Sequence, residues 1–247
     1  MRANGAAMSD ETIKRPKRET TLASNLTEEI RRDIISGGLV PGGKIRLREV
    51  AQRYGVGMSP VREALNRLSR DRLVDQSDLR GFRVAPISAA ELDELMRARC
   101  WLNEIGLRES IRNGDAAWEE AVLLSFHRLS RLPRRLVPGQ RAVNPEWEAA
   151  HRNFHRSLLQ ACGSRWIVEF CDQLFDVADI YRHVARSTLE AAAREGEDEH
   201  RALMEAAVSR DADRAVELLN RHFLRTVTLY KSALAAGDRG GDAPAAP

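Results

Sequence analysis

The sequence has few of the features that mark secreted or membrane proteins. No apolar run approaches the ~20 residues that a membrane-spanning helix needs. The three cysteines, Cys100, Cys162 and Cys171, are odd in number and lack C-x-x-C spacing, so no disulfide framework is expected. Residues 1–20 are polar, lack the apolar core of a secretory signal, and are expected to form a disordered tail. These absences predict a cytoplasmic protein that has no membrane partner.

The charge of the chain is unevenly distributed. Of the 247 residues, 30% are charged and 43% apolar, which is typical of a globular protein with one large or two smaller domains. Residues 1–85 carry 17 Lys and Arg against 11 Asp and Glu, a net charge of +6, whereas the remainder carries a net charge of −3. A basic N-terminal part joined to an acidic body is typical of a nucleic-acid-binding module attached to a second domain.

Apolar periodicity in the N-terminal part predicts three helices followed by a small β-wing. The first helix begins at Leu22 and has one apolar stripe, made of Leu22, Leu26, Ile30 and Ile34. A second helix is expected over 47–54 and a third over 59–70. Short strands at 73–74 and 82–84 flank a turn at 76–81. Residues 21–86 are therefore predicted to form a winged helix-turn-helix DNA-binding domain.

The third predicted helix has the layout of a DNA-reading helix. Ser59 is a suitable N-cap and Pro60 suits the first helical position. Its expected buried stripe is Val61, Ala64, Leu65 and Leu68, and its expected free face is Arg62, Asn66, Arg67 and Arg70. Arg62 lies in the first turn, which meets base edges in most helix-turn-helix proteins, and its guanidinium suits bidentate binding to guanine. The alternative is a small three-helix packing unit with a solvated basic face.

These residues resemble a known family of DNA-binding proteins. Residues 41–68, PGGKIRLREVAQRYGVGMSPVREALNRL, resemble the winged helix-turn-helix of the GntR family of bacterial transcriptional regulators, and PVREAL is the most specific match. The resemblance implies that Arg48 and Arg62 contact the operator and that Gly81 has a role in the wing turn. Family members often carry arginine where Met58 stands. The predicted DNA-binding residues are Arg48, Ser59, Pro60, Arg62, Asn66, Arg67 and Gly81.

From Ser88 onward the apolar pattern is helical throughout. Ser88 and Glu91 form a capping box at the start of a long helix that ends near Asn113. Further helices are expected up to about residue 132, over 145–162, 165–190 and 196–210, and from Asp211 to Ala236. Residues 87–236 are thus predicted to form an all-α antiparallel bundle, and residues 237–247 a disordered tail. The predicted fold is mainly α, a winged domain followed by this bundle.

Four histidines are expected to face the core of the bundle. His151 and His155 are four residues apart and so share one helical face with apolar side chains. Asp211 lies in the expected turn of a helical hairpin, and His200 and His222 each lie 11 residues from it. Folding at this turn would therefore place the two histidines side by side on adjacent antiparallel helices. Four inward imidazoles predict a metal site, and nitrogen-rich sites suit Zn²⁺, Ni²⁺ or Cu²⁺. The alternative is four ordinary core histidines, which would be costly without hydrogen-bond partners.

The other two histidines have less definite surroundings. His127 is expected at the surface. His183 follows Tyr181 and Arg182, a group that would suit either the lining of a cavity or a solvated face.

The helical part also resembles a domain of the same family. HRNFHRSLLQACGS (151–164), EHRALMEAAVSRDADRAVELLNRH (199–222) and RARCWLNE (97–104) resemble the FCD ligand-binding domain of the FadR-like subfamily. The resemblance implies a divalent metal, Zn²⁺ or Ni²⁺, held by His151, His155, His200 and His222. It also implies that Arg99 faces the effector, a small organic acid. Many members have aspartate in place of His151 and glutamate in place of Asn103.

These features predict a transcriptional regulator, most simply a repressor, whose affinity for DNA is set by a small carboxylate. A homodimer would bind a near-palindromic operator. The alternative is a metal-responsive regulator, in which the metal itself is the effector. An enzyme is not expected, because a metallohydrolase needs a general base beside the metal, and Glu148, Glu199 and Glu205 form no known hydrolase motif.

Overall fold

The computed structural model describes residues 22–77, 81–137, 143–184 and 193–237. The predicted N-terminal tail lies outside these residues, as does the C-terminal tail after Gly237. Gly237 itself ends the last helix, one residue beyond the predicted end. No helix of the described part is long and apolar enough to cross a membrane.

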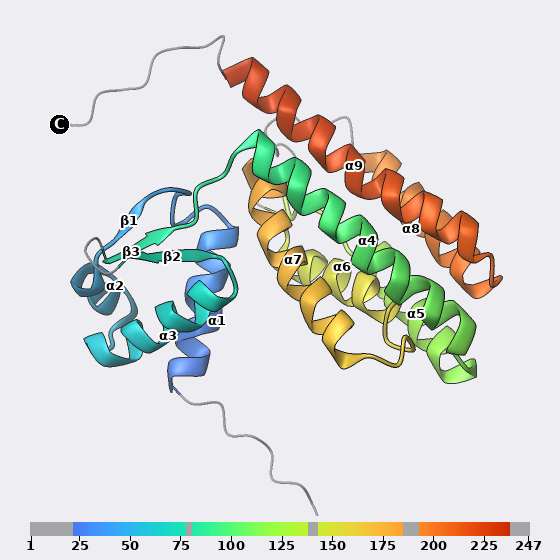
Figure 1. Cartoon of the computed structure of the whole chain (residues 1–247), viewed down its shortest axis with the longest axis horizontal. Helices are drawn as coiled ribbons and strands as arrows, with labels where there is room; N and C mark the ends of the chain where they lie inside the picture. Colours follow the sequence, from blue (N-terminus) through green and yellow to red (C-terminus); the bar gives the residue numbers. More distant parts are fainter. Residues whose placement is uncertain (1–21, 78–80, 138–142, 185–192, 238–247) are drawn as a thin grey trace, which may run out of the picture.

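The N-terminal part is a three-helix unit with a three-stranded antiparallel sheet (Figure 1). Its elements are α1 (Leu22–Ile35), β1 (Lys44–Ile45), α2 (Leu47–Tyr54), α3 (Met58–Arg70), β2 (Val74–Ser77) and β3 (Gly81–Val84). The strand order is β1-β3-β2, with Ile45 opposite Phe82 and Val74 opposite Val84. The two wing strands were predicted. Strand β1 was not, because two residues are too short to show an alternating pattern.

The start of the recognition helix differs from the prediction. Helix α3 begins at Met58, and Gly57, in an extended conformation, is its N-cap without a side-chain hydrogen bond. Ser59 therefore lies inside the first turn, and the predicted cap at Ser59 is wrong. Pro60 is still tolerated there, because the first-turn N–H groups of a helix have no intrahelical partner. The predicted stripe of α3 is completely buried.

The C-terminal part is an all-helical bundle (Figure 1). Its elements are α4 (Ala89–Asn113), α5 (Ala116–Ser130), α6 (Pro145–Ser157), α7 (Arg165–Val184), α8 (Ala193–Val208) and α9 (Ala212–Gly237). The backbone N–H of Glu91 donates to Ser88 Oγ at 3.1 Å, as the capping box requires. Helix α6 ends at Ser157 rather than at 162, because the chain tightens into i to i−3 hydrogen bonds, such as Leu159 N–H to Arg156 O.

Helix α7 belongs to both parts of the molecule. Ile180 is 2% exposed and packs in the core of the winged domain, whereas Tyr181, the next residue, packs in the core of the bundle. The Tyr181 hydroxyl donates to Glu91 Oε2 at 3.2 Å and accepts from the backbone N–H of Ser88. His183 lies against Gly37, at the junction with the winged domain. The placement of the winged domain therefore depends on α7.

Candidate DNA-reading surface and metal centre

The predicted DNA-binding residues lie mostly at the surface. Arg48 on α2, Arg62 in the first turn of α3, Ser59 and Gly81 are exposed. Pro60, Asn66 and Arg67 are partly buried. Helix α3 thus presents Arg62 to solvent while its opposite face packs against α1, which is the arrangement that a recognition helix needs. Lys44 and Arg46 are also exposed and precede Arg48, and the sequence reasoning passed over both.

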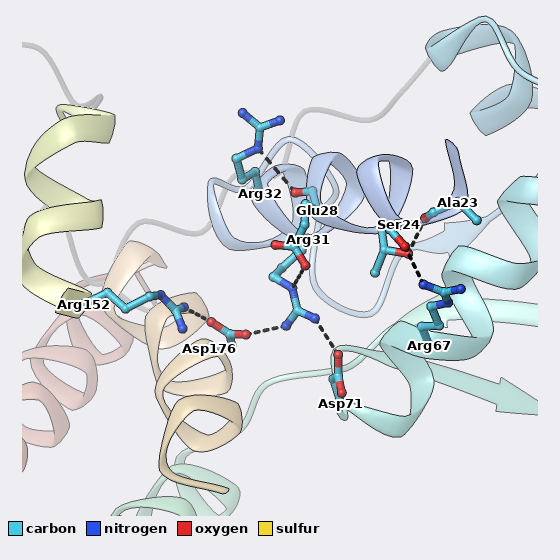
Figure 2. Close-up of polar contacts among 10 residues, drawn as sticks. Ala23, Ser24, Glu28, Arg31, Arg32, Arg67, Asp71, Arg152 and Asp176 are labelled. Atoms are coloured by element: carbon cyan, nitrogen blue, oxygen red, sulfur yellow. Dashed lines mark hydrogen bonds and ion pairs between the residues drawn. The ribbon is translucent and has the colours of Figure 1, made fainter. Parts of the chain in front are cut away.

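Arg67 is already engaged within the protein. Its guanidinium donates to Ser24 Oγ on α1 at 2.9 Å (Figure 2). It also donates to Glu63 Oε1, one turn earlier on α3, at 2.5 Å. These contacts fasten the recognition helix to α1. Arg67 would have to exchange them for a phosphate, unlike Arg62.

The four predicted histidines meet in the bundle. His151 and His155 come from α6, His200 from α8 and His222 from α9. His151 Nε2 lies 3.1 Å from His155 Nε2 and 3.1 Å from His200 Nε2, and the ligand atoms of all four lie within 4.8 Å of one another. The first three side chains are buried, and that of His222 is 19% exposed. The hairpin of α8 and α9 therefore brings His200 and His222 together, as their spacing predicts.

The 3.1 Å spacings from His151 to His155 and to His200 fit a divalent metal, whereas the four ligand atoms together spread up to 4.8 Å and would have to draw closer around one. Bonds of about 2.0–2.1 Å place adjacent ligand nitrogens about 3.0–3.4 Å apart. His222 also has the outer partner that metal-binding histidines usually have, because its Nδ1 lies 2.9 Å from Glu199 Oε2, and Arg225 donates to the other oxygen of that carboxylate. This contact keeps the proton on Nδ1 and leaves Nε2 free for a metal.

His151 has a different outer partner. Arg182 Nη1 donates to His151 Nδ1 at 2.8 Å, which leaves the imidazole proton on Nε2, the atom that faces the other histidines. Metal binding at Nε2 would move that proton to Nδ1 and displace the guanidinium. His151 would therefore bind a metal only at the cost of this hydrogen bond. Arg182 is the member of the 181–183 group that reaches the site.

Burial keeps the imidazoles neutral. Loss of water lowers the pKa values of His151 and His155 well below the usual range, and the positive charge of Arg182 lowers them further. Burial also lowers the pKa of His222, against the opposing effect of Glu199. Burial would raise the pKa of Glu199, but the hydrogen bond from His222 and the hydrogen bond and positive charge of Arg225 hold it at about 2. Neutral imidazole is the form that binds a metal.

Arg99 lies beside this cluster as a buried charge. Arg99 is 6% exposed, and its guanidinium carbon lies 4.0 Å from the centroid of the Phe223 ring. It forms no direct ion pair with any described residue, and its Nε has no hydrogen-bond partner there, but the nearby carboxylate of Asp179, which pairs with Arg182, favours its charge. Burial lowers the pKa of Arg99 to about 10. The buried Asn103 amide donates to the Arg99 backbone oxygen at 2.9 Å.

A small cavity joins Arg99 to the histidines. It is lined by Arg99, His151, His155, Phe175, Arg182 and His222, among others. Its volume of about 20 Å³ has room for about one water molecule. Any larger ligand between the guanidinium and the imidazoles must therefore move side chains or helices.

Two family models cover most of the chain. Residues 22–84 match "Bacterial regulatory proteins, gntR family", and residues 94–225 match "FCD domain". This protein belongs to the GntR family. It is a DNA-binding transcriptional regulator and not an enzyme, and the resemblance seen in its sequence is confirmed.

Several relatives match this GntR regulator along most of their length. It is 36% identical to the HTH-type transcriptional regulator BphR of Paraburkholderia xenovorans, over 83% of each chain. It is 33% identical to the HTH-type transcriptional repressor GlaR of Escherichia coli, over 83% of this chain and 94% of the relative. Among solved structures, E. coli McbR/YncC matches with a TM-score of 0.71 at 19% identity, over 86% of this chain and 98% of McbR, which shows a shared fold.

Proposed function

We propose that a small organic acid, bound at a metal-containing site in the bundle, sets the affinity of this regulator for its operator. The observation that carries the proposal is Arg99, a buried guanidinium with no ion-pair partner among the described residues, beside four converging imidazoles. A buried charge is costly unless it is paired. A carboxylate between Arg99 and the cluster would supply the missing partner.

His155, His200, His222 and His151 would hold the metal, either Zn²⁺ or Ni²⁺. When bound, the metal would supply a Lewis-acid position for one carboxylate oxygen. Arg99 would bind the other oxygen by a charge-assisted hydrogen bond. The apolar rings of Phe175 and Phe223 would exclude water from this contact, which strengthens it.

Entry of the acid requires the bundle to open, because the cavity has room for about one water molecule. The side chains around it come from α4, α6, α7 and α9. Since α7 also packs against the winged domain through Ile180, a shift of α7 would change where the recognition helix lies. Effector and operator would then affect each other's binding by the same factor.

On DNA, we propose a homodimer with one recognition helix in each of two successive major grooves of a near-palindromic operator. Arg48 and Arg62 would contact bases, and Ser59, Pro60, Asn66, Arg67 and Gly81 would support the interface. Trp101 and Ile105 on α4 are 66% and 51% exposed and offer an apolar surface for the second copy. Repression is the proposed sign of regulation, since GlaR is named a repressor.

Domain limits of 21–86 and 87–236, and the cytoplasmic location, remain predictions.

A thermal-shift screen of mono- and dicarboxylates on Zn²⁺-loaded and Ni²⁺-loaded protein tests this function. A bound acid raises the melting temperature by mass action. The acid with the largest shift should also change operator affinity, by about 5–150-fold. Both effects should be lost in Arg99→Gln and kept in Arg97→Gln, an exposed arginine on the same helix. A melting temperature that no acid shifts, or equal shifts in both variants, would contradict the proposal.

The contact between Arg182 and His151 favours a second candidate, in which the metal itself is the effector. A ligand that must give up a hydrogen bond weakens metal binding, and weaker binding permits exchange at cellular concentrations. Under this alternative, chelation alone would change operator affinity and no acid would change it further.

A further inference from the structure

A chain of ion pairs connects the metal-site helix to the recognition helix (Figure 2). Arg152 on α6 pairs with Asp176 on α7, and Asp176 also accepts a hydrogen bond from Arg31 on α1. Arg31 in turn donates to Asp71, at the C-terminal end of α3, at 2.5 Å. Figure 2 shows the four side chains in line, with Asp176 between the two guanidinium groups. We name this chain, Arg152–Asp176–Arg31–Asp71, the interdomain bridge.

The interdomain bridge is sheltered at its centre. The side chain of Asp176 is 6% exposed and that of Arg31 is 16% exposed. Breaking a buried ion pair leaves an uncompensated charge, which is costly, so such a pair holds its elements in a defined position. The surrounding cleft between α1 and the α6–α7 pair has a volume of about 980 Å³. Placement of α1 on this side therefore depends on charge contacts, whereas Ile180, one turn further along α7, forms the apolar contact.

One end of the bridge touches the residues around the metal site. Arg152 follows His151 directly on α6, and its guanidinium lies over the Phe175 ring at 4.8 Å. The same ring packs against His151 and His155, with centroid distances of 5.6 and 5.8 Å. A shift of the imidazoles or of Phe175 would thus move the stacking surface of Arg152.

The other end of the bridge touches the DNA-binding unit. Asp71 is the C-cap residue of α3, so its carboxylate moves with the recognition helix. Helix α1 is fastened to α3 a second time by Arg67 and Ser24. A displacement of Arg31 would therefore be passed to α3 as a whole.

We propose that the interdomain bridge transmits occupancy of the histidine site to the recognition helix, with Asp176 as the shared partner on which it depends. The proposal rests on the function proposed above, because the site must bind a metal for its occupancy to be transmitted. When the imidazoles and Phe175 are fixed by ligation, Arg152 holds Asp176 more firmly, and Arg31 and α1 become better ordered.

Hydrogen exchange of the full-length protein, with EDTA or with Zn²⁺ alone, tests this transmission. In the parent protein, Zn²⁺ should slow exchange in residues 145–157, which carry two of the ligands, and also in 22–35 and 71–77. In Asp176→Asn the effect on 145–157 should remain and the effect on the other two segments should be lost. The matched control is Asp172→Asn, which removes the Arg156–Asp172 pair between the same two helices, at 3.5 Å, without a contact to α1.

The outcomes distinguish a failure of the interdomain bridge from a failure of the metal site. If Asp176→Asn responds to Zn²⁺ like the parent, or if the parent responds only in 145–157, the bridge does not transmit occupancy, although the metal site stands. If Zn²⁺ slows exchange nowhere, the metal site itself is wrong and the bridge has nothing to transmit. Should Asp176→Asn not fold, Asp71→Asn breaks the outer link at a side chain that is 21% exposed, and must abolish the response in 71–77.

Discussion

The two domains bury different kinds of side chain. Among the described residues of the winged domain, the buried polar residue is Thr27, whose hydroxyl donates to the Ala23 backbone oxygen. The bundle buries many more, namely Arg99, Asn103, Ser110, Asn144, His151, His155, Ser157, Asp176, Asp179 and His200. Buried polar groups destabilise a fold unless each has a partner. The winged domain therefore has an almost entirely apolar core, whereas the bundle holds its polar cluster at a cost in stability.

The largest expected effect on stability follows from the apolar core of the winged domain. Leu65 is completely buried in α3, so Leu65→Ala should lower the free energy of unfolding of the winged domain by about 2–5 kcal/mol and abolish operator binding. Leu22→Ala, at a side chain that is 62% exposed, is the matched control and should change little. Circular dichroism melts and operator titrations check both. Retained operator binding in Leu65→Ala would show that the core is less rigid than its packing implies.

The next effect distinguishes the bundle by its dependence on pH. The folded-state pKa values of His151, His155 and His222 lie below the ordinary histidine value of 6.5, so the unfolded chain binds more protons between the two values. The stability that these neutral imidazoles contribute to the metal-free protein is thus fully present above about pH 6.5, and it is lost as the pH falls below that value. Each imidazole contributes up to about 1.4 kcal/mol per pH unit.

Denaturant unfolding in EDTA between pH 7.5 and about 5 measures this loss. His155→Leu should flatten the profile, because it replaces one titrating imidazole by an apolar side chain of similar volume. An equally steep profile in His155→Leu would assign the pH dependence to other groups. Glu199, with a pKa of about 2, contributes stability that is lost only at much lower pH, below about 4.5.

A smaller effect, on operator affinity, is expected at the surface of the winged domain. Arg62→Ala should weaken operator binding by about 1–3 kcal/mol and leave the melting temperature unchanged, because the exposed guanidinium has no role in the core. Arg67→Ala should lower the melting temperature as well, since it loses Ser24 and Glu63. Fluorescence anisotropy and thermal melts separate the two arginines. Identical behaviour of both variants would place Arg67 on DNA in the same way as Arg62.

The same contrast explains what the sequence could predict. Periodicity located the buried stripe of α3, and the equal spacing of His200 and His222 around Asp211 placed two ligands together, because both depend on local helix geometry. Three features depend on packing between distant segments and left no local signal: Arg182 on His151, the shared helix α7, and Asp176 between two arginines. The misplaced cap at Ser59 has a local cause, since Gly57 competed for the same position.

The smallest predicted effect concerns the outer partner of one metal ligand. Arg182→Gln removes a positive charge and offers an amide oxygen that accepts from His151 Nδ1–H, so Nε2 is free to bind a metal. Zn²⁺ affinity should rise, by up to about tenfold, in a competition titration with a chelating dye. Arg156→Gln, which removes an exposed guanidinium on α6 together with its 3.5 Å pair with Asp172, is the control for loss of positive charge and should leave affinity unchanged. Weaker Zn²⁺ binding in Arg182→Gln would mean that the guanidinium supports the site, and that its hydrogen bond to His151 does not oppose metal binding.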